Sequence, residues 1–81
     1  DPVYYGQAYE MLAHLYELEA RYDEALEAYT AYLTVRPEIR DESLAQENYK
    51  WYYLQQKWSH EPNNIAVLND LGQLAILKKQ Y

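Results

Sequence analysis

The stretches YEMLAHLY at residues 9–16 and ALEAYTAYLTVRP at residues 25–37 decide the fold of this chain. In the first stretch, apolar or small residues recur at the i, i+3, i+4, i+7 spacing of one helix face: Tyr9, Leu12, Ala13 and Tyr16. In the second, Ala25 and Tyr29 lie about one helical turn apart, and Pro37 disfavours helix for the residue before it. The sequence therefore predicts two amphipathic helices, and the short link between them makes the pair antiparallel.

Charged and turn-forming residues predict where the helices begin. Asp23 suits the first turn of the second helix, because a carboxylate is favourable near the exposed N–H groups there. Asp41 is expected to cap a third helix that runs to about residue 59. The turn HEPNN at residues 60–64 then predicts a fourth helix, capped by Asn63 or Asn64. We therefore expect an all-α chain with about four helices in antiparallel succession.

Composition limits the classes of function. The chain has 81 residues, no cysteine and a net charge of −6. Residues 1–36 hold seven acidic and two basic side chains, giving −5, whereas residues 63–81 give +1. An acidic front half argues against nucleic acids and anionic membranes as partners, and no apolar run approaches the roughly 20 residues of a membrane span. The first residues, Asp1 and Pro2, suit a helix start. A beginning other than Met also predicts a piece of a longer protein.

The spacing resembles that of a tetratricopeptide repeat (TPR), a helix–turn–helix unit of about 34 residues with the signature W-x2-L-G-x2-Y, A-x3-F and P. The positions that carry the resemblance are Tyr9, Leu12, Ala13, Tyr16, Ala25, Tyr29 and Pro37, and, for the first helix of a further unit, Leu68, Leu71, Gly72 and Ala75. Small residues there are expected to lie at helix crossings, and the large ones to pack beside them. The chain departs from the family pattern at Ala13, where Gly is usual, and at Tyr32, where a small residue is usual.

The resemblance divides the chain into three parts. Residues 1–39 read as a TPR-like helix pair, residues 61–81 as the first helix of a truncated unit, and residues 40–60 as a single aromatic-rich helix. Tyr9 and Leu68 occupy equivalent places but are 59 positions apart, whereas two repeats would need about 68. The middle part is therefore nine residues too short for a helix pair.

The resemblance also implies a binding surface. In this family the first helix of each unit lines the concave face, which would present six polar residues: Glu10, His14, Glu17, Asn69, Asp70 and Gln73. Some TPR modules bind acidic C-terminal tails with a lysine and an asparagine at the places held here by Glu10 and His14. Two carboxylates on the first helix would repel such a tail. We therefore expect a protein or peptide partner of basic or mixed charge.

The middle helix is apolar on more than one face, which calls for burial on more than one side. Two interpretations stay open for its aromatic residues Trp51, Tyr52 and Trp58. They form either a surface for a partner or for self-association, or the inner face of a helix covered by other repeats.

Signals of catalysis are lacking in the sequence. His14 and His60 are the only histidines, neither has a second histidine one turn away, and no glycine-rich phosphate loop is present. We expect no enzyme activity, no cofactor and no metal site. The expected function is protein–protein interaction as a scaffold or adaptor segment. The alternatives are structural self-association or packing between repeats, and a regulatory or assembly domain of a larger enzyme or export machine. Cytoplasmic and periplasmic locations both stay open.

Overall fold

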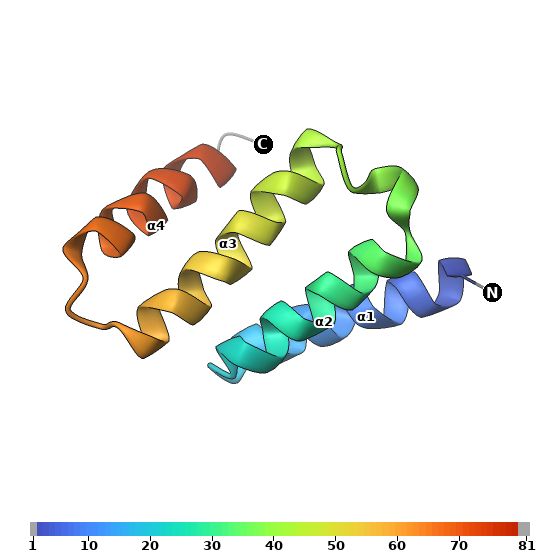
Figure 1. Cartoon of the computed structure of the whole chain (residues 1–81), viewed down its shortest axis with the longest axis horizontal. Coiled ribbons are helices and arrows are strands. Elements are labelled where there is room, and N and C mark those ends of the chain that lie inside the picture. The colour runs from blue at the N-terminus through green and yellow to red at the C-terminus, as the bar shows by residue number, and fades with distance from the viewer. Residues whose placement is uncertain (1, 80–81) are drawn as a thin grey trace.

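The computed structural model describes residues 2–79 and is all-α over that range. It contains four α-helices and one short 3-10 helix, and no strand lies within the described residues: α1 is Pro2–Leu18, α2 is Tyr22–Val35, η1 is Pro37–Ile39, α3 is Ser43–His60 and α4 is Ile65–Lys78 (Figure 1). The expected all-α, repeat-like class with four antiparallel helices is confirmed.

The helices are stacked in the order in which they occur in the chain. α1 packs most extensively on α2, α2 packs on α3, and the contact between α3 and α4 is the smallest of the three (Figure 1). The result is an elongated body of 41 × 25 × 17 Å. Packing mainly between neighbouring helices is typical of solenoid proteins.

The larger of two cores joins α1, α2 and α3. At the crossing of α1 and α2, the small residues Ala13 and Ala25 have no exposed surface, which lets the two helices approach closely. Tyr29 of α2 and Tyr52 of α3 fill the space beside them, with ring centroids 5.0 Å apart. The buried members of this first core are Ala13, Ala25, Ala28, Tyr29, Leu33, Ala45 and Tyr52.

A smaller core joins α3 to α4. Leu54, Val67 and Leu74 are buried there, and the half-buried side chains of Trp51, Trp58 and Leu71 pack against them. α3 therefore buries two faces, with Tyr52 turned towards α2 and Leu54 towards α4.

The residues at repeat positions outside these cores differ in how far they are exposed. Tyr9, Tyr16 and Ala75 are half-buried, but Leu12 and Leu68 are exposed. Gly72 does not lie at a helix crossing among the described residues, because a Cβ placed on it would meet no atom within 4 Å. The glycine at a close approach is instead Gly6, where a Cβ would lie 2.9 Å from Cγ of Arg36.

One of the two expected helix starts needs correction. Asp23 lies in the first turn of α2, as expected, but α3 is preceded by Glu42 rather than by Asp41 as its N-cap. The Glu42 side chain makes no capping hydrogen bond. The cause is η1, which the sequence analysis did not anticipate: Pro37 opens a 3-10 turn, and the N–H of Glu42 then bonds to the carbonyl of Ile39 at 3.0 Å. The expected cap at Asp1 lies outside the described residues.

The structure shows which of two candidate asparagines caps α4. Asn64, and not Asn63, is the N-cap, and its side-chain oxygen accepts a hydrogen bond from the N–H of Val67 at 3.3 Å. This bond satisfies one of the N–H groups that have no partner within the helix.

The turn between α1 and α2 is closed by hydrogen bonds of a Schellman motif. The N–H of Arg21 bonds to the carbonyl of Tyr16 at 2.8 Å, and the N–H of Ala20 bonds to that of Glu17 at 3.0 Å. Ala20 occupies the left-handed position, with a φ of 59°, which usually belongs to glycine because a Cβ is strained there.

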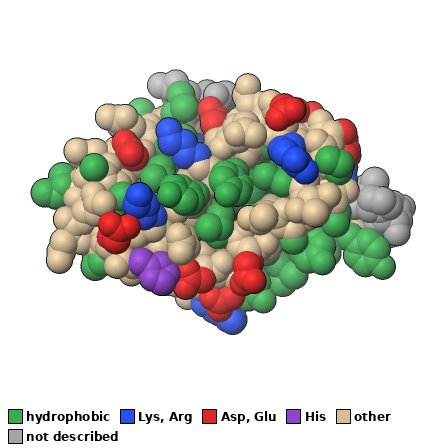
Figure 2. Space-filling view, viewed as in Figure 1, with side chains coloured by type: hydrophobic (Ala, Val, Ile, Leu, Met, Phe, Trp, Pro, Cys, Tyr) green, Lys and Arg blue, Asp and Glu red, His purple; other side chains and the backbone are tan. Residues whose placement is uncertain are grey.

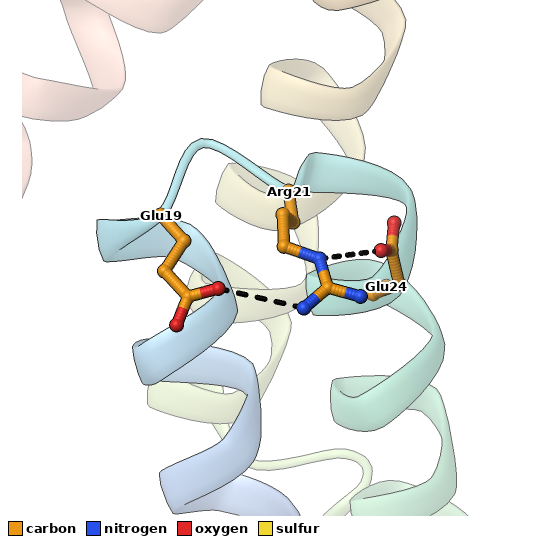
Figure 3. Close-up of polar contacts among 3 residues, drawn as sticks. All are labelled: Glu19, Arg21 and Glu24. Atoms are coloured by element: carbon orange, nitrogen blue, oxygen red, sulfur yellow. Dashed lines mark hydrogen bonds and ion pairs between the residues drawn. The ribbon is translucent and has the colours of Figure 1, made fainter.

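Arg21 also holds this turn through its side chain (Figure 3). Its guanidinium donates to Glu24 at 2.7 Å and to Glu19 at 3.4 Å, and it lies 4.8 Å from the ring centroid of Tyr16. These contacts are exposed, so each contributes little stability.

We predict that Ala20→Gly stabilises the fold by about 1 kcal/mol, because it removes the strain of a left-handed alanine. For a domain of this size, that gain raises the thermal midpoint by roughly 4–8 °C. Thermal unfolding followed by circular dichroism measures it. Ala8→Gly, in the interior of α1, is the matched control and should destabilise by about 0.5–1 kcal/mol. An unchanged or lower midpoint for Ala20→Gly contradicts the prediction.

We predict that Asn64→Ala destabilises the fold by about 1 kcal/mol, because the N–H of Val67 loses its partner. Urea unfolding measures the difference. Asn63→Ala, one position earlier in the same turn, is the control and should change the free energy of unfolding by less than half as much. Equal effects of the two substitutions would show that Asn64 is not the cap.

Candidate functional site

A groove of about 540 Å³ lies across the first core. All four α-helices contribute to it: its lining consists of Glu10, His14 and Glu17 from α1, Tyr29 from α2, Asn48, Trp51 and Tyr52 from α3, and Ala75 and Lys78 from α4. It therefore combines a carboxylate-bearing side, three aromatic rings and one lysine.

The base of the groove is aromatic and firmly packed. Tyr29 is only 2% exposed and Tyr52 only 8%, and their rings are tilted by 33° to each other. Tyr32 extends the cluster, with its ring centroid 5.4 Å from that of Tyr29. Because these rings also belong to the first core, the base of the groove is formed before any ligand arrives.

The α1 side of the groove is acidic. Glu10, His14 and Glu17 follow one another at intervals of four and three residues, so they share a helix face. His14 Nδ1 lies 3.6 Å from Glu17 Oε1. These three residues, which were expected to share one face of the helix, line the same groove.

Hydrogen bonds connect the sides of the groove. The indole Nε1 of Trp51 donates to Glu17 Oε2 at 2.5 Å, which connects α3 to α1. Lys78 Nζ donates to Asn48 Oδ1 at 2.6 Å and lies 5.8 Å from the ring centroid of Trp51, which connects α4 to α3. A charged hydrogen bond of this kind is stronger than a neutral one. Side chains from three helices are thus held in place around Trp51.

The other expected concave residues lie elsewhere. Asn69, Asp70 and Gln73 are exposed on α4 and do not line the groove. Asp70 and Gln73 line a separate depression of about 150 Å³ between α3 and α4, together with Lys50. Of the six residues expected on one face, three line the groove, two line this depression, and Asn69 lines neither.

The three aromatic residues of the middle helix, Trp51, Tyr52 and Trp58, do not all line the groove. Trp51 and Tyr52 line the groove, whereas Trp58 packs on the smaller core and does not. The indole Nε1 of Trp58 is buried without a hydrogen-bond partner among the described residues.

Asn48 and Lys78 belong to the groove but were not singled out from the sequence. Lys78 continues the line of Leu71 and Ala75 along α4 at helical spacing, and this periodicity could have identified it. No comparable signal exists for Asn48, because its role depends on the packing of α3 against α2 and α4.

Burial alters the titration of the two tyrosines at the base of the groove. For Tyr29, loss of hydration raises the pKa to about 12, although a hydrogen bond with Asn48 partly opposes this change. Burial likewise raises the pKa of Tyr52, and the charge of Glu17 adds to the effect. Both hydroxyls therefore stay neutral at physiological pH, available as hydrogen-bond donors.

The described residues show no metal-binding cluster. Within residues 2–79, no three His, Cys, Asp or Glu side chains lie close enough together to hold an ion. His60 instead contacts Asp23 at 2.8 Å, which connects the end of α3 to the start of α2. Hydrogen bonding to His60 lowers the pKa of Asp23.

None of the described helices combines the length and the apolar character needed to cross a lipid bilayer.

Comparison of the chain with protein-family models, curated proteins and solved structures found no match. The resemblance to TPR units accordingly depends on the spaced residues quoted above.

We predict that stability falls as pH rises from about 10 to 12. Below the ordinary tyrosine pKa of 10, Tyr29 and Tyr52 are protonated in both folded and unfolded chains. Above it, the unfolded chain releases these protons while the folded chain still holds them, so the free energy of unfolding decreases. Urea unfolding across this pH range measures the loss.

The double variant Tyr29→Phe, Tyr52→Phe should make this pH dependence shallower. Tyr4→Phe, Tyr53→Phe is the matched control, because both of its side chains are exposed, and it should keep the dependence of the original chain. Equal slopes for the two double variants would contradict the assignment to the buried pair.

Proposed function

We propose that this chain is a protein–protein interaction module that binds a peptide or helix of a partner protein in the groove. The proposal rests on one observation: the groove has a buried aromatic base, and its α1 side bears carboxylates. Aromatic residues provide much of the energy at protein interfaces, and a site formed in advance loses little entropy when it binds.

The charges around the groove favour a partner of basic or mixed charge. Glu10 and Glu17 attract Lys or Arg side chains, and the net charge of −6 adds a long-range attraction. Lys78, near the α4 end, suits an occasional carboxylate of a mixed sequence. An acidic tail would meet two carboxylates and one ammonium group, which is unfavourable.

In this proposal the chain is a TPR-like scaffold or adaptor segment of a larger assembly and not an enzyme. The spaced repeat residues and the packing of each helix mainly on its neighbours support this interpretation. The other candidates, a packing segment without a groove of its own and a regulatory domain of a larger enzyme or export machine, are less favoured, because neither explains the polar contacts around Trp51.

We predict that the chain selects basic peptides from a displayed library of random 12-residue peptides. Selected sequences should be enriched in Lys and Arg and should bind more weakly at high salt, since screening reduces attraction between exposed charges. Enrichment in Asp and Glu, or no enrichment of any sequence, contradicts the proposal.

Two matched double variants test whether the selected peptides bind in the groove. Glu10→Gln, Glu17→Gln removes two charges but keeps an acceptor for the indole of Trp51, and it should weaken the selected peptides about tenfold. Glu27→Gln, Glu42→Gln removes the same charge from exposed residues outside the groove and should change binding less than twofold. Similar losses in both variants would mean that net charge, and not the groove, attracts the peptides. Isothermal titration calorimetry measures each affinity.

A further inference from the structure

An apolar stripe lies exposed on α1. Its residues follow one another at alternating intervals of four and three: Tyr4, Ala8, Met11, Leu15 and Leu18. This alternation is the heptad spacing by which one helix packs along another. The stripe is well exposed, since Tyr4, Met11 and Leu18 show 75%, 65% and 69% of their surface. We call these five residues the α1 outer face.

A second apolar stripe lies exposed on α4. It consists of Ile65, Leu68, Gly72 and Ile76, at intervals of three and four residues, and we call it the α4 outer face. Ile65 is 71% exposed and Ile76 is 64% exposed. Gly72, at its centre, has open space where a side chain would be. A helix placed here could therefore approach closely, as small residues allow at helix crossings.

The two faces lie at opposite ends of the stack. α1 and α4 are its first and last helices, because each helix packs mainly on its neighbours in the chain. In Figure 2, hydrophobic side chains appear along the lower right edge, where α1 lies, and at the left edge, where α4 lies. Neither face includes a residue that lines the groove.

The lengths of the two faces match. At about 1.5 Å of rise per residue, the α1 outer face is roughly 21 Å long and the α4 outer face roughly 17 Å long. Ala8, a small residue on the α1 outer face, suits the space above Gly72 of another copy.

The exposed apolar area of α1 approaches that of one side of a specific interface. With the adjacent Tyr5 and Leu12, the exposed apolar side chains of α1 present on the order of 700 Å², compared with about 800 Å² from each partner in a standard interface. Patches above a few hundred Å² are uncommon on monomers.

The charges favour contact between the two different helices. α1 carries Glu10 and Glu17 and no Lys or Arg, a charge of −2, whereas the charges of Asp70 and Lys78 on α4 cancel. Contact between two α1 outer faces would bring two acidic helices together, whereas contact between α4 and α1 joins an acidic helix to a neutral one. The second arrangement also covers both apolar stripes.

We propose that the α4 outer face of one copy binds the α1 outer face of a second copy, so that copies associate head to tail. Each assembly then keeps one free α1 and one free α4 at its two ends, so the association is open-ended instead of closing at a dimer. The groove stays uncovered in each copy, so this proposal is independent of peptide binding.

Light scattering on a sizing column, over a concentration series of the full chain, tests the proposal. The average mass should rise with concentration to more than twice that of one chain. Met11→Glu places a charge on the α1 outer face, and Ile76→Glu does the same on the α4 outer face; each variant alone should stay monomeric. Thr30→Glu, on an exposed position of α2, is the matched control and should associate like the original chain.

A mixture of the two variants provides the decisive test. The Met11→Glu copy keeps an intact α4 and the Ile76→Glu copy an intact α1, so an equimolar mixture should form a 1:1 heterodimer of twice the single-chain mass and grow no further. Leu18→Glu and Ile65→Glu repeat the test with independent substitutions, and circular dichroism checks that each variant keeps its helices.

Three results would overturn the proposal. The first is an original chain that stays monomeric at every concentration, which would leave both outer faces without a second copy as their partner. The second is a closed dimer that Met11→Glu dissociates and Ile76→Glu does not, which would indicate pairing between two α1 helices. The third is a variant mixture that forms no heterodimer.

Discussion

The two-sided burial of α3 is the constraint on which the rest of the structure depends. Tyr52 packs on Tyr29 of α2, while Leu54 packs on Val67 and Leu74 of α4, so a single helix serves both cores. A helix with one apolar face would end the stack after three helices. Because α3 has two, α4 can be added, and α1 and α4 remain on opposite sides with the groove between them. α3 is therefore the junction between the two cores.

The groove results from this arrangement of the helices, and polar contacts connect its sides. Trp51 lies between the two apolar faces of α3, and its indole nitrogen reaches Glu17 while Lys78 approaches its ring. Tyr29 and Tyr52 contribute both to stability and to the shape of the groove, since their rings are core residues and also form its base. Substitution of these two residues therefore affects the fold as well as the groove. Glu10 is exposed and can be changed with little cost to the fold, whereas a substitution of Glu17 must keep an acceptor for the indole of Trp51.

The sequence predicted the helices well, because each one carries its own periodicity and its own start or stop signal. It also placed Glu10, His14 and Glu17 together, since these residues share one face of one helix. It failed where the answer depends on contacts between helices. Gly72 matched a repeat position, but within residues 2–79 no neighbouring helix approaches it. Asn69, Asp70 and Gln73 lie away from the groove because α4 packs on α3 through Leu74. The 3-10 turn at Pro37 was missed because a proline that ends a helix can also begin a turn.

The small contact between α3 and α4 has a consequence for the dynamics of the molecule. Few buried side chains hold α4, so it forms the part of the stack that can separate locally while α1, α2 and α3 stay folded. Separation removes Ala75 and Lys78 from the groove and opens one of its ends. Closure of the groove and docking of α4 are therefore one equilibrium. Any ligand that contacts Lys78 slows hydrogen exchange throughout α4, including residues that the ligand never touches.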